Sequence, residues 1–138
     1  MRFVCASALE LGALPSAGVD VLFASNLLEH LDDAELARAM QEFKRVLKPG
    51  SRVILLQPNF HYAYREYFDD YTHKKVFTHV SLRDFFEANG FAAIDVFPRF
   101  LPFSLKSRLP KSYYLTKLYL LSFIKPMAKQ MLLVFRMG

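Results

Sequence analysis

The sequence has 138 residues, which is long enough for one domain with its own core. Its net charge of +5 is uneven: residues 1–95 carry 10 basic and 13 acidic side chains, and residues 96–138 carry 8 basic and no acidic ones. No apolar run approaches the ~20 residues of a membrane-spanning helix, and the single cysteine excludes an internal disulfide. We therefore expect one globular domain in a reducing, cytoplasmic setting.

The first part of the sequence reads as two buried strands joined by a turn-rich segment. Residues 2–5 and 19–24 are almost wholly apolar, as expected for strands with both sheet faces covered. Residues 6–18 are small and contain glycines and a proline. We expect Cys5, in the first of these strands, to be buried and unreactive.

A helix and a third strand are predicted next. Asp32 or Asp33 can cap this helix, and Glu35 stands three residues after Asp32, as in a capping box. Apolar residues then recur at helical spacing, at Leu36, Met40, Phe43 and Leu47. Residues 48–50, Lys-Pro-Gly, are typical of a helix end, and the β-rich residues 52–56 follow.

Residues 57–80 do not resemble a core element. They contain Pro58, five aromatic residues between Phe60 and Phe68, two adjacent acids and three histidines. A long irregular segment inside a compact domain is usually functional. We therefore expect residues 58–80 to form a lid or substrate loop.

The remaining segments continue the alternation of strands and helices. Ser81 is the expected cap of a helix over residues 82–89, which Gly90 ends. We further expect a strand at 91–96, a Pro- and Lys/Arg-rich stretch at 97–113, a helix at 115–124 and a strand at 131–136. This alternation predicts an α/β fold with a mostly parallel sheet, in which the last strand is an antiparallel edge strand.

Several of these segments resemble one enzyme family. Asp20–Leu31, followed by Arg45-Val-Leu-Lys-Pro-Gly-Ser51 and an apolar strand, resembles the class I S-adenosylmethionine-dependent methyltransferases, in particular the small-molecule group. In that family an Asp opens the fourth strand, Glu-His follows its end, and RVLKPGG precedes the fifth strand. Asp70–Thr78 is similar to the family's lid. The resemblance implies a single Rossmann-like methyltransferase domain over residues 1–138, with residues 97–130 as a basic, aromatic insertion on the substrate side.

The resemblance also implies residues that would hold S-adenosylmethionine. The family's loop after its third strand touches the adenine, and the matching residues here are Ser7, Ala8 and Leu9. Beyond the fourth strand, the residues expected along the cofactor are Ser25, Asn26 and Leu27. Ser7 stands where Asp is commonest in the family. Turn formation and local backbone bonding are the alternative roles of the polar residues in both groups.

Two histidines are the candidate catalytic residues. The resemblance implies that His30 faces the transferred methyl group as a base or orienting group, with a structural role in the turn as the alternative. His73 in the lid is the second candidate, and Tyr67 and Tyr71 are candidates for binding substrate. Ubiquinone-biosynthesis O-methyltransferase has a Glu-x-x-Glu-His metal motif, but Asn26 replaces its first Glu here, so we expect no metal site.

The C-terminal part suggests a class of acceptor. Residues 97–138 resemble the tails of bacterial methyltransferases linked to cell-surface polysaccharide synthesis, which implies a saccharide or lipid-linked acceptor. Their basic charge and the helical pattern at 113–125 also fit an anionic membrane surface, with core packing of the apolar residues as the alternative. The sequence has no recognisable nucleic-acid-binding module, so we expect no such partner.

Only 19 residues precede Asp20, and they contain no Gly-rich cofactor loop. We therefore expect the C-terminal two-thirds of the methyltransferase fold, N-terminally truncated. The predicted function is S-adenosylmethionine-dependent methyl transfer to a small-molecule or saccharide/lipid-linked acceptor, incomplete in this chain. The alternative is a non-catalytic methyltransferase-like interaction module that forms homo-oligomers or binds membranes peripherally, because a sheet without its neighbouring strands exposes edges and apolar surface.

Overall fold

A single mixed sheet organises the molecule. The computed structural model describes residues 3–102, 112–122 and 124–138. Its four strands, in spatial order β1-β2-β4-β3, are β1 (Val19–Ser25), β2 (Leu47–Pro58), β4 (Ala128–Met137) and β3 (Phe91–Pro102). β1 and β2 are parallel, and β4 runs antiparallel to both of its neighbours. The structure thus confirms the predicted α/β class, but the described sheet is mixed and not mostly parallel, because β4 pairs antiparallel with two strands.

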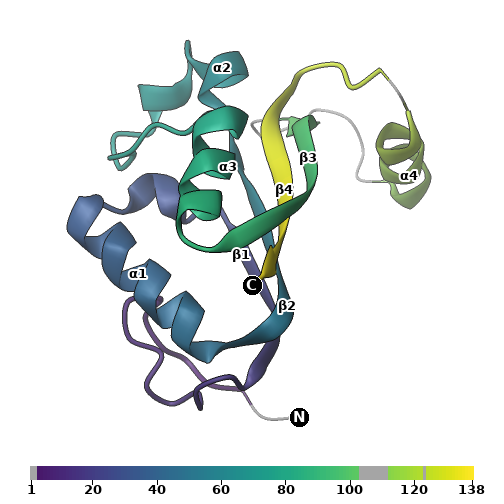
Figure 1. The fold of residues 1–138 in the computed structure, drawn as a ribbon. Coiled ribbons are helices and arrows are strands. Elements are labelled where there is room, and N and C mark those ends of the chain that lie inside the picture. Colours follow the sequence, from purple (N-terminus) through teal and green to yellow (C-terminus); the bar gives the residue numbers. More distant parts are fainter. Residues whose placement is uncertain (1–2, 103–111, 123) are drawn as a thin grey trace.

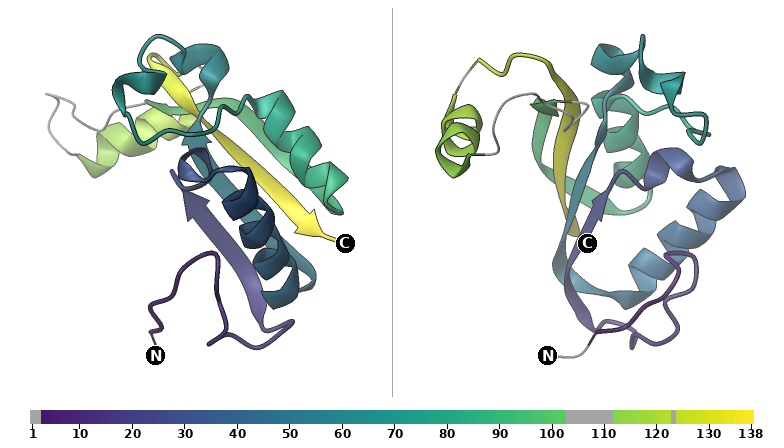
Figure 2. Two further views of the ribbon diagram at one scale, coloured as in Figure 1. Left: turned by 90° about the vertical axis from the view of Figure 1, so that its left-hand side faces the viewer. Right: turned by 180° about the vertical axis from the view of Figure 1, so that it is seen from behind.

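Two helices cover one face of this sheet. They are α1 (Asp33–Val46) and α3 (His79–Ala88), which lie on the same side in Figures 1 and 2. Alternate residues of the central strands point into this layer and are fully buried, as Val53, Leu55 and Leu133 are. The ring of Phe86 on α3 stacks on Phe135 of β4 with ring centres 4.7 Å apart. The core therefore lies between the sheet and these two helices.

The predicted cap is confirmed at the start of α1 and shifted for α3. The predicted end of α1 is wrong: the helix ends at Val46, and residues 47–50 begin β2, because Leu47 pairs with β1. The Asp32 side chain accepts from the backbone N–H of Glu35, and the Glu35 side chain accepts from that of Asp32, which completes the capping box. In α3 the N-cap is Thr78, not Ser81, because Thr78 and Ser81 cap each other and the helix starts at His79. Gly90, with φ of 89°, follows the end of α3 in the left-handed region.

Four short elements complete the described chain: η1 (Leu28–His30), α2 (Phe60–Ala63), η2 (Tyr67–Asp69) and α4 (Tyr113–Leu121). The expected loop at 58–80 thus contains α2 and η2. α4 stands apart from the sheet in Figure 1, and none of its residues is buried. Within the described ranges, every helix is too short or too polar to cross a bilayer.

The prediction that the last strand lies at an edge is wrong. β4 is antiparallel, as expected, but it lies between β2 and β3. α3 carries the chain from β2 to β3 and leaves a gap one strand wide, which β4 fills. The central position suits its sequence, because Met131, Leu133 and Phe135 are fully buried and both of its backbone edges are hydrogen-bonded.

The predicted first strand also does not form in the described residues. Residues 3–6 have no regular structure, and Cys5 is exposed. The next residues make a tight turn, in which Ser7 bridges to Glu10. The segment 11–18 is instead held against the end of α1, since Ala17 and Gly18 donate backbone hydrogen bonds to the carbonyls of Arg45 and Val46. The expectation of a buried thiol is therefore wrong as well.

The face of the sheet opposite α1 and α3 carries exposed apolar side chains. On β1, Val21 is 54% and Phe23 61% exposed, and Phe97 on β3 is 43% exposed. Ile54, the partner of Phe23 in register, and Leu132, the partner of Phe97, are only partly buried. This open face bears on whether the chain associates with another molecule.

Candidate functional site

The candidate site lies at the carboxyl end of β1, where η1 leads into α1. Ligands of open α/β sheets bind at such strand ends. The segment that follows η2 folds over this point: the backbone N–H groups of Lys74 and Lys75 donate to the carbonyl of Glu29 at 2.8 and 3.0 Å. Their side chains form ion pairs with Glu35 and Asp33 on the first turn of α1. Two segments more than 40 residues apart are thereby held together.

Asn26 fixes the loop that leaves β1. Its φ of 48° lies in the left-handed region, which Asn tolerates better than most residues. Its backbone N–H donates to the Leu56 carbonyl at 2.8 Å, and its side-chain oxygen accepts from the amide of Gln130 at 3.2 Å. Ser25 and Asn26 are exposed and Leu27 is half-buried. These three predicted cofactor residues lie together at the strand end, and their roles stay predictions.

His73 is held in one orientation by the segment 58–80, to which it belongs. Its side chain is only 5% exposed, and Nδ1 donates to the backbone carbonyl of Tyr67 at 2.6 Å. The ring lies against the ring of Tyr67, with centres 4.5 Å apart, and against that of His30, with centres 4.9 Å apart. Because a carbonyl can only accept, Nδ1 of His73 carries the hydrogen, and Nε2 offers a lone pair in the neutral ring.

His30 is oriented by a chain of hydrogen bonds from the segment 58–80. Its Nδ1 faces the hydroxyl oxygen of Thr72 at 2.9 Å and the Thr72 carbonyl at 3.3 Å. The Thr72 hydroxyl donates to the Asp70 carboxylate at 2.6 Å. The hydrogen bonds from Thr72 lower the pKa of Asp70, which therefore stays ionised. The hydrogen bonds of Nδ1 leave Nε2 as the free nitrogen of His30. Since the rings of His30 and His73 are in contact, the structure brings both predicted catalytic histidines together.

Glu29 is the functional candidate that the site prediction omitted. It is fully buried, and neither carboxylate oxygen has a hydrogen-bond partner. Burial raises its pKa above the usual range for a glutamate. One carboxylate oxygen of Glu29 and one ring nitrogen each of His30 and His73 lie within 4.8 Å of one another. The Glu29-His30 pair in the sequence was the available signal, but nothing there indicated that His73 would join it. We call these three residues the Glu-His-His cluster.

The two predicted substrate tyrosines lie in opposite environments. Tyr67 has no exposed surface, and its hydroxyl donates to the Lys75 carbonyl at 2.6 Å. Burial raises the pKa of Tyr67 far above its usual range. In this conformation it supports His73 and presents no surface to a ligand. Tyr71 is 92% exposed and is free to meet a ligand, so its substrate role stays a prediction.

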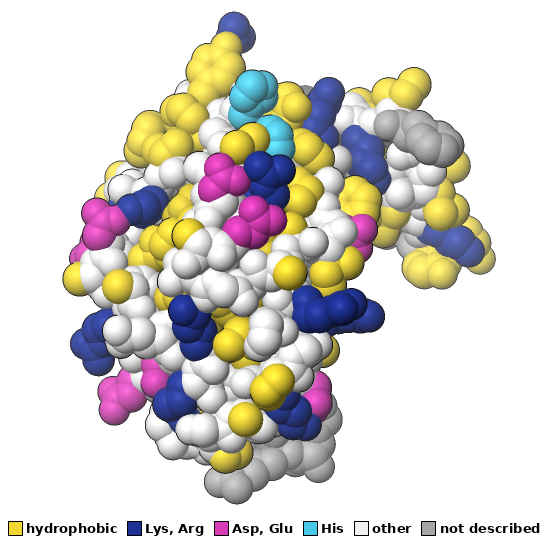
Figure 3. Space-filling view, in the orientation of Figure 1, with side chains coloured by type: hydrophobic (Ala, Val, Ile, Leu, Met, Phe, Trp, Pro, Cys, Tyr) yellow, Lys and Arg dark blue, Asp and Glu magenta, His cyan; other side chains and the backbone are white. Residues whose placement is uncertain are grey.

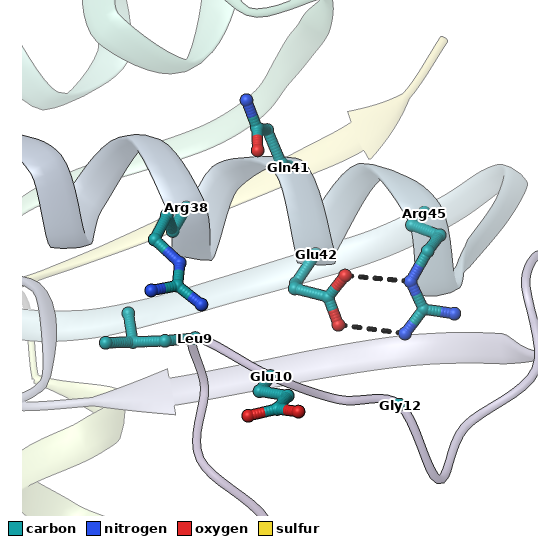
Figure 4. Close-up of a pocket in the computed structure, with 7 residues that line it drawn as sticks. All are labelled: Leu9, Glu10, Gly12, Arg38, Gln41, Glu42 and Arg45. Atoms are coloured by element: carbon teal, nitrogen blue, oxygen red, sulfur yellow. Dashed lines mark hydrogen bonds and ion pairs between the residues drawn. The ribbon is translucent and has the colours of Figure 1, made fainter.

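Ser7, Ala8 and Leu9 lie away from the Glu-His-His cluster. The Ser7 hydroxyl accepts from the Leu9 N–H at 3.2 Å, which is the local turn role that was the alternative. Leu9 lines a pocket of about 340 Å³ against the middle and end of α1, with Arg38, Glu42 and Arg45 among its walls (Figure 4). The strand-end loop and the cluster adjoin the first turn of α1 instead. The structure therefore does not join the two predicted groups of cofactor residues into one pocket.

Comparisons with known proteins identify the fold. Residues 1–55 match the methyltransferase domain family, whereas no curated protein sequence matches the chain. Two solved structures are SAM-dependent methyltransferases from Archaeoglobus fulgidus (21% identity, TM-score 0.68) and Thermotoga maritima (16% identity, TM-score 0.66). Both matches cover 96% of this chain. They cover 66% of the Archaeoglobus chain and 62% of the Thermotoga chain. A complex containing the Haloferax volcanii Trm112 methyltransferase activator also matches at 14% identity and a TM-score of 0.67, with 97% of this chain and 60% of that chain covered.

Proposed function

Because the chain has the fold of S-adenosylmethionine-dependent methyltransferases and matches their domain family over residues 1–55, we propose that it takes part in S-adenosylmethionine-dependent methyl transfer. The observation that carries this proposal is the Glu-His-His cluster, which lies at the strand end where such sheets bind ligands. The proposed acceptor is a small molecule or a saccharide/lipid-linked compound. The chain spans 66% or less of the length of the matched structures named above. The shared fold therefore does not establish the activity, which is our proposal.

The strand-end loop fits part of a cofactor site. Ser25 and Asn26 present polar side chains at the end of β1, and the left-handed turn at Asn26 is held by Leu56 and Gln130. The segment at Ser7–Leu9 lies elsewhere along α1, so its proposed adenine contact needs that segment to move or another residue to act. When bound, S-adenosylmethionine supplies an electrophilic methyl group on a cationic sulfur.

The histidines supply what the acceptor needs. Methyl transfer depends mainly on aligning the acceptor atom with the methyl carbon and sulfur, so positioning accounts for much of the rate. The Nδ1 atoms of His30 and His73 are held as donors, and the free Nε2 of either ring can accept the proton that the acceptor loses. This nitrogen would take up the proton as the acceptor oxygen gains the methyl group, which bound S-adenosylmethionine would supply.

Isothermal titration tests cofactor binding directly. We expect S-adenosylmethionine to bind saturably, and substitution of Ser25 together with Asn26 by alanine to weaken binding at least tenfold. Arg83→Ala, on the exposed side of α3, is the matched control that leaves affinity unchanged. A folded chain that does not bind S-adenosylmethionine, by itself or within any longer polypeptide in which it occurs, would exclude methyl transfer.

A non-catalytic interaction module is the second candidate function. The open face of the sheet, with Val21 and Phe23 more than half exposed, favours it because exposed apolar patches usually mark contact surfaces. Homo-oligomers that bury this face would sediment above the monomer mass. Val21→Ser with Phe23→Ser should return them to monomers, and a wild-type chain that sediments as a monomer would count against the module.

The proposed membrane contact concerns α4. This helix exposes apolar side chains on all sides, including Tyr114, Leu118 and Leu121, with exposed Ile124 nearby. In Figure 3 the region of α4 shows hydrophobic and basic side chains together. Residues 96–138 contain no acidic residue, so an anionic lipid surface complements them in charge. Such a surface would place the reaction at the cytoplasmic side of a membrane and suits a lipid-linked acceptor.

A further inference from the structure

We propose that Glu29, His30 and His73 bind a divalent transition-metal ion of the Zn²⁺ type. One ligand atom of each lies within 4.8 Å of the others, and two of the three side chains are almost fully enclosed. The prediction of no metal site rested on Asn26, which replaces a glutamate of the metal motif. The structure instead brings in His73 from the lid, 43 residues after His30.

Hydrogen bonding leaves one electron-pair donor on each of the three side chains. Both histidines commit Nδ1 to carbonyl or hydroxyl oxygens, so each Nε2 offers a lone pair. Glu29 offers a buried carboxylate whose two oxygens accept no hydrogen bond. Buried polar atoms in folded proteins nearly always have partners. A divalent cation would satisfy all three groups at once.

The groups behind the ligands match those of known metal sites. A metal-binding histidine commonly donates its other N–H to a carbonyl or, directly or through a relay, to a carboxylate, which fixes the tautomer and ring direction. His73 donates to the Tyr67 carbonyl at 2.6 Å. His30 donates to Thr72, whose hydroxyl donates in turn to the ionised Asp70. Both rings are therefore prepared to bind through Nε2.

The donor set selects the class of ion. Imidazole nitrogens favour Zn²⁺ and its neighbours in the transition series, whereas Mg²⁺ and Ca²⁺ prefer oxygen ligands throughout. Two histidines and one glutamate form a ligand set that leaves a coordination position open. Ligands around a tetrahedral Zn²⁺ lie about 3.4 Å apart for bonds of about 2.1 Å, so the widest separation in the cluster, within 4.8 Å, must contract by up to about 1.4 Å. His30 is only half-buried and ends the short η1, so its ring has room to turn.

The open position gives the ion a role toward substrate. A bound cation would occupy both Nε2 atoms and so replace the histidines as the activating group: it would take an oxygen of the acceptor as a ligand, lower the pKa of that hydroxyl and hold it near the methyl donor. This role rests on the proposed function. Binding of the ion itself does not, because it depends only on the three side chains.

Titration of the metal-free chain followed by NMR of its four histidines tests the proposal. After treatment with chelator, one equivalent of Zn²⁺ should shift the ring-nitrogen signals of His30 and His73 and leave those of His61 and His79 in place. Calorimetry should give one Zn²⁺ per chain, whereas Mg²⁺ at the same concentration should produce no heat. Glu29→Gln should weaken Zn²⁺ binding at least tenfold, and the matched control His61→Gln should leave it within twofold.

Two outcomes would overturn the proposal. One is a folded wild-type chain whose His30 and His73 signals do not respond to Zn²⁺, which would mean that protons alone satisfy the cluster. The other is equal Zn²⁺ affinity of wild type and Glu29→Gln. The NMR measurement needs no variant, so the test holds even if Glu29→Gln unfolds. Binding of S-adenosylmethionine, measured separately, distinguishes failure of the metal site from failure of the proposed function.

Discussion

The ring of His73 donates a hydrogen bond to the backbone carbonyl of Tyr67, 2.6 Å away and six residues earlier in the chain. Tyr67 is fully buried and in turn donates from its hydroxyl to the carbonyl of Lys75, beyond His73. Tyr67 thus supports the segment around His73 through hydrogen bonds on both sides of that histidine. The sequence predicts Tyr67 as a substrate contact, but in this conformation its side chain stabilises the segment around His73.

Tyr67→Phe should therefore destabilise the fold. It removes the hydroxyl that the Lys75 carbonyl accepts from, at a cost of about 1 kcal/mol in the free energy of unfolding. Tyr71→Phe is the matched control, since Tyr71 is 92% exposed and should change stability by less than ~0.5 kcal/mol. Urea unfolding measures both. Equal stability of the two variants would mean that the Tyr67 hydroxyl contributes nothing.

His73→Ala should impair methyl transfer far more than it impairs folding. Loss of a positioned proton acceptor typically costs about 10²-fold or more in rate, whereas the lost hydrogen bond to Tyr67 costs about 1 kcal/mol in stability. The measurement is formation of S-adenosylhomocysteine with an identified acceptor, at a temperature where the variant remains folded. His61→Ala, whose side chain lies outside the cluster, should retain wild-type turnover. A His73→Ala enzyme with full turnover would remove His73 from the catalytic group.

Asn26 offers a way to separate backbone from side-chain effects at the strand end. Asn26→Ala places a residue without local polar contacts at φ of 48° and loses the bond to Gln130, so we expect a loss of about 1–2 kcal/mol in unfolding free energy. Asn26→Gly suits the positive φ and loses only the side-chain bond, so it should cost less than Asn26→Ala. Thermal unfolding of both variants provides the comparison. If the glycine variant is the less stable, the side-chain bond matters more than the turn.

The elements were predictable because hydrophobic spacing and caps are local signals. The Asp32–Glu35 capping box, the apolar stripe of α1 and the glycine after α3 all appear in the structure where the sequence places them. The central position of β4 was harder to predict, because strand order depends on the gap that the crossover through α3 leaves. The continuous apolar run of residues 131–135 is nevertheless typical of a central strand, because both faces of such a strand are covered.

The cluster was only partly predictable for a similar reason. His30 and His73 were each identified, but their contact depends on Lys74 and Lys75 donating to the Glu29 carbonyl across more than 40 residues. Such a backbone contact leaves no pattern in the sequence. Ser7 and Leu9 illustrate the opposite case, because a match to a family motif gave them a role that their position along α1 does not yet support.

The ion pair beneath the pocket in Figure 4 predicts a dependence of stability on pH. Arg45 and the Leu11 N–H bond to the Glu42 carboxylate and lower its pKa to about 2. A carboxylate whose pKa is lower in the folded than in the unfolded state stabilises the fold above the unfolded pKa, near 4.5, and loses that effect as the pH falls toward 2. Glu42→Gln should therefore be less stable than wild type at pH 7, with a difference that shrinks between pH 4.5 and 2.

Glu10→Gln is the matched control, since Glu10 lines the same pocket without the bonds to Arg45. Urea unfolding at a series of pH values measures both variants. A stability difference between wild type and Glu42→Gln that persists unchanged at pH 2 would show that the Glu42 charge does not hold the segment at 11–18.

The exposed apolar side chains of α4 make the membrane contact testable. Leu118 and Leu121 are 67% and 71% exposed, and burying each in a lipid interface is worth about 1.5–2 kcal/mol. The chain should therefore co-sediment with vesicles containing phosphatidylglycerol, and less so as salt screens its basic residues. Leu118→Asp with Leu121→Asp should lower vesicle affinity at least tenfold, whereas Val80→Asp, on the exposed side of α3, should not. Two results would contradict the membrane contact: equal co-sedimentation of the wild type and both variants, or no co-sedimentation of the wild type with anionic vesicles. Either result would indicate that α4 does not bind lipid.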